Sequence, residues 1–285
     1  MGSGGSTLCG CGSRGQSREH RTGPLRLHNF LHTLVIGVPP SLTVAALPPN
    51  ALRHSGRLSS RSSGAPVAKG WQLSLAGALL VALPVFLQAP WVRLAPFSAA
   101  LFTAPLLLVG IALAQHPNPR LSTAGALLVG FSGSWLGGCL FWGWCRLHPL
   151  WHLPIEAFAL PLALGGLNGR WRLAASFYLA SLLGTACTDG VMAITGVMQH
   201  WTDVLLAPVD QAADLLQAAA LGVLQPFPLS VTLLAGALLL TLCRRYWNHP
   251  DPAWRLAASA IATTLAVDGV FLAASLWAPQ LSGLI

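Results

Sequence analysis

Three carboxylates lie within long apolar stretches of this 285-residue chain. Glu156, Asp189 and Asp268 each fall inside a segment long enough to cross a membrane. A charge at the centre of a membrane costs roughly 2.5–3.5 kcal/mol on insertion scales, so such groups usually mark a functional site. We expect the three to meet in the outer half of the membrane and to share water and protons. The alternatives are a helix-end position near water for Asp189 and a structural hydrogen bond for Asp268.

Three histidines could extend this site with proton or metal chemistry. His148, His152 and Glu156 are spaced four residues apart, the repeat of one helix face, and His200 is predicted on the same side of the membrane. Imidazoles beside a carboxylate can relay protons or ligate a metal ion. Two prolines within this stretch argue against a regular helix, and nearby tryptophans make an interfacial position the alternative. The pattern predicts an outer-face proton or metal relay but identifies no metal and no other cofactor.

A separate acidic pattern occurs in residues 203–225. Asp203, Asp210, Asp214 and Gln217 have sequence offsets of 0, 7, 11 and 14. In one helix these offsets fall within roughly 60° of a single face. We expect a helix at the outer membrane surface with its acidic face in water. The alternative is a spanning helix that lines a polar path.

The composition defines the class of protein that must position these residues. Charged residues are only 8% of the chain and hydrophobic residues 54%, whereas soluble domains carry about 25% charged residues. A surface this poor in charge must face lipid or partner subunits. The formal charge of +8 does not indicate nucleic-acid binding, because half of the basic residues precede residue 70 and the others lie in short loops. Such charges orient helices and contact anionic lipids.

The apolar stretches predict an all-α, polytopic transmembrane bundle of about seven spans, within a range of six to eight. Residues 71–285 form this transmembrane domain, and residues 1–70 are a basic, Gly/Ser/Arg-rich extension predicted to be disordered. Each predicted span is near the ~20 residues that cross a membrane. Their cores are 71–90, 94–115, 121–143, 150–168, 172–198, 226–244 and 255–278.

Basic residues predict the orientation of these spans, because cytoplasmic loops carry an excess of Lys and Arg. The N-terminus is expected in the cytoplasm and the C-terminus outside, provided that residues 203–225 do not cross. An internal repeat accompanies this topology. The sequence W-R-L-A-A-S occurs at 171–176 and 254–259, and D-G-V follows each copy, beginning at Asp189 and Asp268.

The motifs of soluble active sites, such as H-E-x-x-H, G-x-S-x-G and the P-loop, do not occur in the sequence. One stretch instead resembles a known family: L-P-I-E-A-F-A-L-P at 153–161, G-G-L at 165–167 and S-L-L-G-T-A-C-T-D at 181–189. These residues resemble a family of uncharacterised cyanobacterial membrane proteins, a domain of unknown function, over about residues 71–280. The resemblance implies a cyanobacterial thylakoid or plasma membrane, and it brings no activity or ligand.

Three functions remain open from the sequence. The first hypothesis is movement of a small ion, proton or solute through a polar site within the bundle, because acids in spans, prolines in helices and repeats are typical of transporters. The alternative is an accessory or assembly factor that binds subunits or pigments of photosynthetic complexes through its Trp- and His-rich outer rim. The third is an intramembrane enzyme. Membrane lipids are expected partners in each case.

Overall fold

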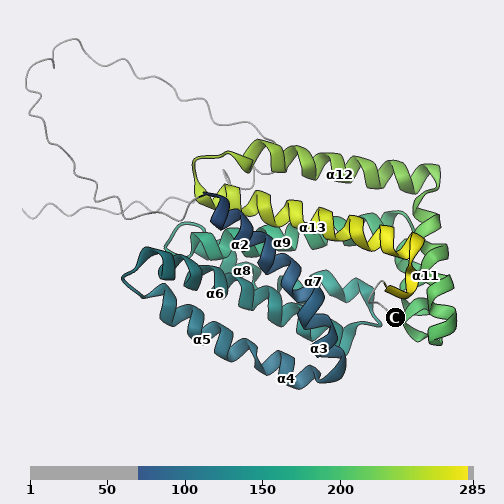
Figure 1. Ribbon diagram of the computed structural model, residues 1–285, viewed down its shortest axis with the longest axis horizontal. Helices are drawn as coiled ribbons and strands as arrows, with labels where there is room; N and C mark the ends of the chain where they lie inside the picture. Colours follow the sequence, from purple (N-terminus) through teal and green to yellow (C-terminus); the bar gives the residue numbers. More distant parts are fainter. Residues whose placement is uncertain (1–69, 282–285) are drawn as a thin grey trace, which may run out of the picture. The chain divides into compact units, whose positions relative to one another are not determined.

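The structure is a computed structural model that describes residues 70–281, and every regular element in this range is a helix (Figure 1). In lipid, a helix satisfies its backbone groups within the segment, so apolar stretches of this length favour helices. The predicted all-α fold is therefore confirmed for the described residues. The predicted disordered extension, apart from Gly70, lies outside them.

Six helices in the described range are long and apolar enough to cross a membrane. The chain is therefore a polytopic helical membrane protein, and these six helices fall within the predicted range of six to eight spans. The first span comprises α2 (Gly70–Leu83), the π-helix η1 (Pro84–Gln88) and α3 (Ala89–Leu94), and the second comprises α4 (Pro96–Leu101) and α5 (Thr103–Ala114). The third comprises α6 (Pro119–Leu140) and the π-helix η2 (Phe141–Cys145), and the others are α9 (Arg172–Ile194), α12 (Pro226–Trp247) and α13 (Pro252–Trp277).

Helix α9 packs between α6 and α13 (Figure 1). Close contacts set the direction of each neighbour. Gly130 of α6 lies against the backbone of Ala174, and Gly184 of α9 lies against Thr264 of α13. Further along, Gly133 of α6 lies against Tyr178 of α9, and Thr188 of α9 bonds to Asp268 of α13, so the three helices run parallel. The missing side chains at these glycines let the helix backbones approach closely, as is common in membrane bundles.

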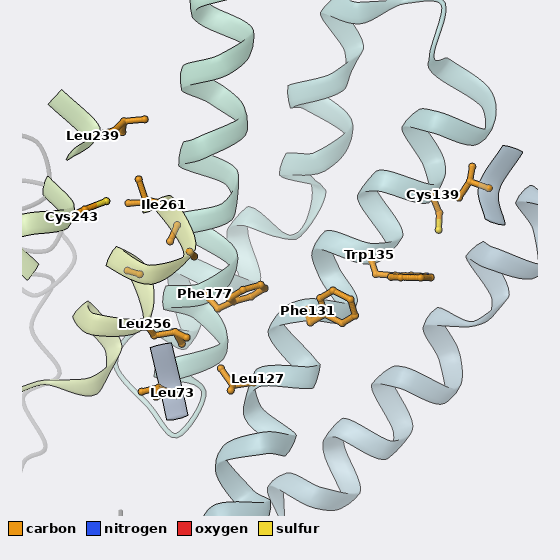
Figure 2. Packing of buried hydrophobic residues seen from close by; sticks show 14 of the residues in the cluster. Leu73, Leu127, Phe131, Trp135, Cys139, Phe177, Leu239, Cys243, Leu256 and Ile261 are labelled. Carbon is orange, nitrogen blue, oxygen red and sulfur yellow. The ribbon is translucent and has the colours of Figure 1, made fainter. Parts of the chain in front are cut away.

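The apolar core fills the space where α2, α6, α9 and α13 meet (Figure 2). Phe131 and Trp135 of α6, Phe177 of α9 and Leu256 of α13 are almost fully buried. The indole N–H of Trp135 also donates to the carbonyl of Ala99, at 2.9 Å. This packing fixes the heights of α6, α9 and α13 relative to one another, and these helices carry or contact the predicted acids.

Residues 149–166, called the broken segment below, connect α6 to α9. They form the 3₁₀ helix η3 (Pro149–Trp151), α7 (His152–Glu156), the 3₁₀ helix η4 (Ala157–Ala159) and α8 (Leu160–Gly166). The predicted span at 150–168 is therefore not one continuous helix, in keeping with the prolines that argue against a regular helix there. Its three prolines, at 149, 154 and 161, lack the N–H that a continuous helix needs. Because α6 and α9 are parallel, this segment leads the chain back from the end of α6 to the start of α9.

Basic residues gather at one end of the bundle. Arg172 at the start of α9 pairs with Asp251 just before α13, and Arg255 lies beside Gly70 at the start of α2. This arginine-rich end holds Arg120, Arg170, Arg172, Arg244, Arg245 and Arg255. The opposite end, called the acidic end, holds the end of α9 and the segment that follows it.

That segment forms the 3₁₀ helix η5 (Val197–His200), α10 (Trp201–Leu206) and α11 (Val209–Val223). The prediction that Asp203 shares one helix face with Asp210 and Asp214 is wrong, because the chain breaks before Pro208 and places Asp203 on α10, whereas Asp210 and Asp214 lie four residues apart on α11. All three side chains are exposed. Helix α11 spans about 22 Å at 1.5 Å per residue, which is short of the ~30 Å of membrane hydrocarbon. It packs against α13, and Gln217 donates to the carbonyl of Leu276 at 2.8 Å. The described chain ends with η6 (Pro279–Leu281).

Candidate functional site

Helix α7 carries two of the predicted site residues on one turn. His152 and Glu156 are four residues apart and therefore share a face of this short helix. The turn packs closely on α6, where a Cβ added to Gly137 would lie 3.0 Å from the Cα of Glu156. Glycine at this position lets the backbone of the broken segment sit directly against α6. The ring of Phe141 stacks on the His152 imidazole with centroids 4.2 Å apart.

His152 bridges two carboxylates. Its Nε2 lies 3.3 Å from Oε1 of Glu156, and its Nδ1 lies 3.1 Å from the carboxylate oxygens of Asp189. A neutral imidazole has one donor nitrogen, whereas the protonated ring donates from both. Ionised carboxylates can only accept, so the doubly donating ring satisfies both contacts at once. The three side chains keep 16–19% of their surface exposed, so they are sheltered but not sealed from their surroundings.

Helix α9 supplies two hydroxyls that connect this bridge to the third acid. Thr185 donates to Oε2 of Glu156 at 2.9 Å, and Thr188 donates to Oδ2 of Asp268 at 2.7 Å. Thr185, Thr188 and Asp189 are spaced by three and four residues and so lie on one helix face. Asp268 of α13 therefore lies beside the residue that precedes Asp189. We call His152, Glu156, Asp189, Asp268 and the two threonines the carboxylate–histidine cluster.

Tyr178 supports the break next to the cluster. Its hydroxyl donates to the backbone carbonyl of Glu156 and accepts the N–H of Ala159 at 3.2 Å. Backbone groups left without helical partners are costly inside a membrane unless a neighbour satisfies them. One buried side chain on α9 thus meets two such groups where α7 passes into η4. This contact holds the turn that carries His152 and Glu156.

The cluster lies far from the arginine-rich end, measured along the bundle axis. Thr188 and Asp268 each come 16 residues after the first residue of their helices, which is about 24 Å at 1.5 Å per residue. The two copies of W-R-L-A-A-S lie at the other end of the same parallel helices. Figure 1 shows α9 and α13 running beside each other, with α7 nearby.

The structure brings together some of the predicted residues and leaves others apart. Glu156, Asp189 and Asp268 belong to one cluster with His152. Within residues 70–281, His152 is the one predicted histidine that contacts a carboxylate. His148 packs near Trp151, with ring centroids 6.3 Å apart, and His200 ends η5. Asp203, Asp210 and Asp214 are exposed at the acidic end.

No group of three or more His, Cys, Asp or Glu side chains in the described part of the chain is arranged to hold a metal ion. The sequence patterns do not point to Thr185, Thr188 or Tyr178 as site residues. Thr185 and Thr188 precede Asp189 by four residues and one residue, a spacing that could have drawn attention to them. For Tyr178 the sequence offers no such signal, because its two partners are backbone groups of a turn that only the fold creates.

The fold defines a polytopic helical membrane protein, and the carboxylate–histidine cluster is its candidate site. The family model for the protein of unknown function DUF3120 matches residues 77–276, and the chain belongs to that family. This confirms the predicted membership of an uncharacterised domain family. Comparison with curated proteins and with solved structures found no match.

Proposed function

We propose that this protein moves a small ion or solute across its membrane, and that proton binding at the carboxylate–histidine cluster drives or gates the movement. The observation that carries this proposal is the position of His152. It bridges an acid on its own broken segment and an acid on a continuous neighbouring helix. Charged side chains that meet inside a membrane bundle typically mark ion pathways and proton relays.

Proton transfer to the cluster changes how the broken segment is held. With His152 protonated and both acids ionised, the ring donates to Glu156 and to Asp189 and joins α7 to α9. A proton added to either carboxylate removes one of these charged contacts. A proton lost from the ring leaves one nitrogen without a hydrogen to donate. Each change loosens the same link, so protonation and the position of α7 are coupled.

The broken segment is suited to such a change because its position depends on side chains. Helix α7 is a single turn of five residues, so few of its backbone groups have hydrogen-bond partners within the helix. Discontinuous helices near the centre of a bundle form the binding sites of many transporters, because their free backbone groups and helix ends face the substrate. The partial exposure of His152, Glu156 and Asp189 supports access to the cluster.

The charges at the two ends support an orientation for this movement. Six arginines lie at the arginine-rich end, whereas the acidic end has Arg93 and Arg146 beside three exposed aspartates on α10 and α11. By the positive-inside rule the arginine-rich end is placed in the cytoplasm. The carboxylate–histidine cluster then lies in the outer half of the membrane. A cyanobacterial thylakoid or plasma membrane is the expected location.

Proton movement into liposomes tests the proposal. The purified protein is reconstituted with a pH-sensitive dye and potassium inside, and a potassium diffusion potential is imposed against external sodium chloride or sodium sulfate. We expect the wild-type protein to carry protons in at least one salt, and Asp189→Asn to slow this by about tenfold or more. Asp214→Asn, the same change at an exposed acid outside the cluster, should stay within about twofold. Equal rates for the two variants, or no proton movement in any salt, would contradict the proposal.

The accessory-factor alternative is favoured by an aromatic rim at the end of α6. Trp144 and Trp151 are 46% and 60% exposed there, and Phe97 packs on Trp144. Exposed aromatic side chains are enriched both at membrane interfaces and at protein interfaces. Purification from its own membrane in mild detergent separates the two functions. A photosynthetic subunit or pigment that elutes with the protein, and that Trp151→Ala releases, would support the accessory function.

A further inference from the structure

A cavity of about 640 Å³ lies away from the carboxylate–histidine cluster, at the arginine-rich end between α2, α12 and α13. Its floor is one face of α13, which includes Arg255 and Ala266, and one wall is the exposed face of α2, which includes Trp71 and Leu75. Trp247 at the end of α12 belongs to the lining at the arginine-rich end. The cavity is therefore open along the outside of the bundle and polar at one end.

The polar end is built to receive an anion. The guanidinium of Arg255 lies in the lining and donates from Nη2 to the carbonyl of His249 at 3.1 Å. A guanidinium has five N–H donors, so this bond orients the group and leaves most of its donors for a ligand. Asp251, the acid near this end, is already paired with Arg172. Asn248 adds an amide to the same end of the lining.

The rest of the cavity follows the bundle axis and is mainly apolar, because the hydroxyls of Ser74, Ser259 and Thr263 in its lining already donate to backbone carbonyls. From Arg255 to Ala266 is eleven residues of α13, or about 16 Å, close to half of the ~30 Å hydrocarbon thickness. Leu75 of α2 is 50% exposed along this stretch. Trp71 and Trp247 lie at the polar end, where aromatic side chains meet lipid headgroups. Charge and polarity thus change along the cavity as they do along one leaflet.

We propose that this cavity binds one anionic phospholipid, with its phosphate on Arg255 and an acyl chain along α13 toward Ala266. The charge of Arg255 selects an anionic over a neutral headgroup. The apolar stretch beyond it distinguishes a lipid from free phosphate, which would fill only the polar end. The site is independent of the carboxylate–histidine cluster, so either proposal can fail without the other.

Lipid-dependent stability of the full-length purified protein tests this site. Thermal unfolding is measured with added phosphatidylglycerol, phosphatidylcholine or inorganic phosphate. We expect phosphatidylglycerol to stabilise the protein most, and Arg255→Gln to weaken its apparent affinity about fivefold, the worth of one arginine at a charged membrane surface. Arg244→Gln is the matched control, because it removes the same charge from an exposed position at the same end that does not line the cavity.

A second variant keeps the test decisive if Arg255→Gln does not fold. Ala262 lines the floor, and Ala262→Phe should fill the cavity and abolish the preference for phosphatidylglycerol while the lipid-free protein unfolds at a similar temperature. A photo-crosslinking residue at position 262 should capture phosphatidylglycerol. Equal stabilisation by phosphatidylcholine or phosphate, equal losses for Arg255→Gln and Arg244→Gln, or crosslinking to residues 1–69 of the same chain would overturn the proposal.

Discussion

Helix α9 and the broken segment lie side by side and connect the same two ends of the bundle, yet their backbones are held in different ways. Helix α9 has no proline between Arg172 and Ile194 and forms one continuous helix. The broken segment has three prolines in 18 residues and forms four short pieces. A continuous helix satisfies its own backbone groups, whereas an interrupted one needs partners from its neighbours.

This difference assigns separate roles to the two halves of the cluster. Helix α9 presents Thr185, Thr188 and Asp189 from a rigid frame that packs on both α6 and α13. The broken segment presents His152 and Glu156 from a single turn, which the contacts of Gly137, Tyr178 and Asp189 hold in place. One half of this site is fixed on a rigid helix, and the other half is held by side-chain contacts. Such a site can change its geometry when a proton binds. The predictions below act on the contacts that hold the second half.

The largest expected effect follows from Gly137→Leu. The added side chain would start 3.0 Å from the Cα of Glu156 and must push the turn of α7 away from α6. We expect a loss of about 3 kcal/mol in the free energy of unfolding, together with loss of proton movement in liposomes. Gly165→Leu on α8 is the matched control, since nothing lies within 4 Å of a Cβ at Gly165. Similar stability for both variants would mean that close packing of α6 on the broken segment is not required.

A smaller effect is expected from Tyr178→Phe. This change keeps the ring in the core but removes the hydroxyl that serves the carbonyl of Glu156 and the N–H of Ala159. Leaving such groups without a partner costs about 1–3 kcal/mol, so the free energy of unfolding should fall by about 2 kcal/mol. Amide hydrogen exchange at Ala159 should also become faster while exchange within α9 stays slow. Unchanged exchange at Ala159 would show that the break does not depend on this hydroxyl.

The sequence was sufficient for the class of fold, and it selected three acids that the structure places in one cluster. Lipid imposes length and polarity so strictly that the apolar stretches predict the six long helices to within a few residues. The same cost of burying charge singled out Glu156, Asp189 and Asp268. His152 was identified because its spacing from Glu156 matches a helix turn, and that single turn is present even though the helix around it is not.

What the sequence could not provide depends on contacts between distant segments. The prolines in 150–168 argue against a regular helix, but the sequence does not show that Tyr178 supplies hydrogen-bond partners to the backbone at the break. Asp203 was grouped with Asp210 and Asp214 by helix periodicity, and Pro208 removed that relation. Asp189 contacts His152 only because α9 and α7 are held at matching positions along the bundle axis. The close glycine contacts of α9 with α6 and α13, and of α6 with α7, set these positions.

The most direct test of this account is the protonation state of His152 in the folded protein. Nitrogen NMR of the ¹⁵N-histidine-labelled protein at pH 7.5, with His152→Gln used to assign the signal, distinguishes a ring protonated on both nitrogens from a neutral ring. We expect both nitrogens to carry a proton, because each faces a carboxylate, and we expect Asp189→Asn to shift the ring toward the neutral form. A neutral His152 ring that Asp189→Asn leaves unchanged would contradict the charged bridge and, with it, the proposed proton-linked movement.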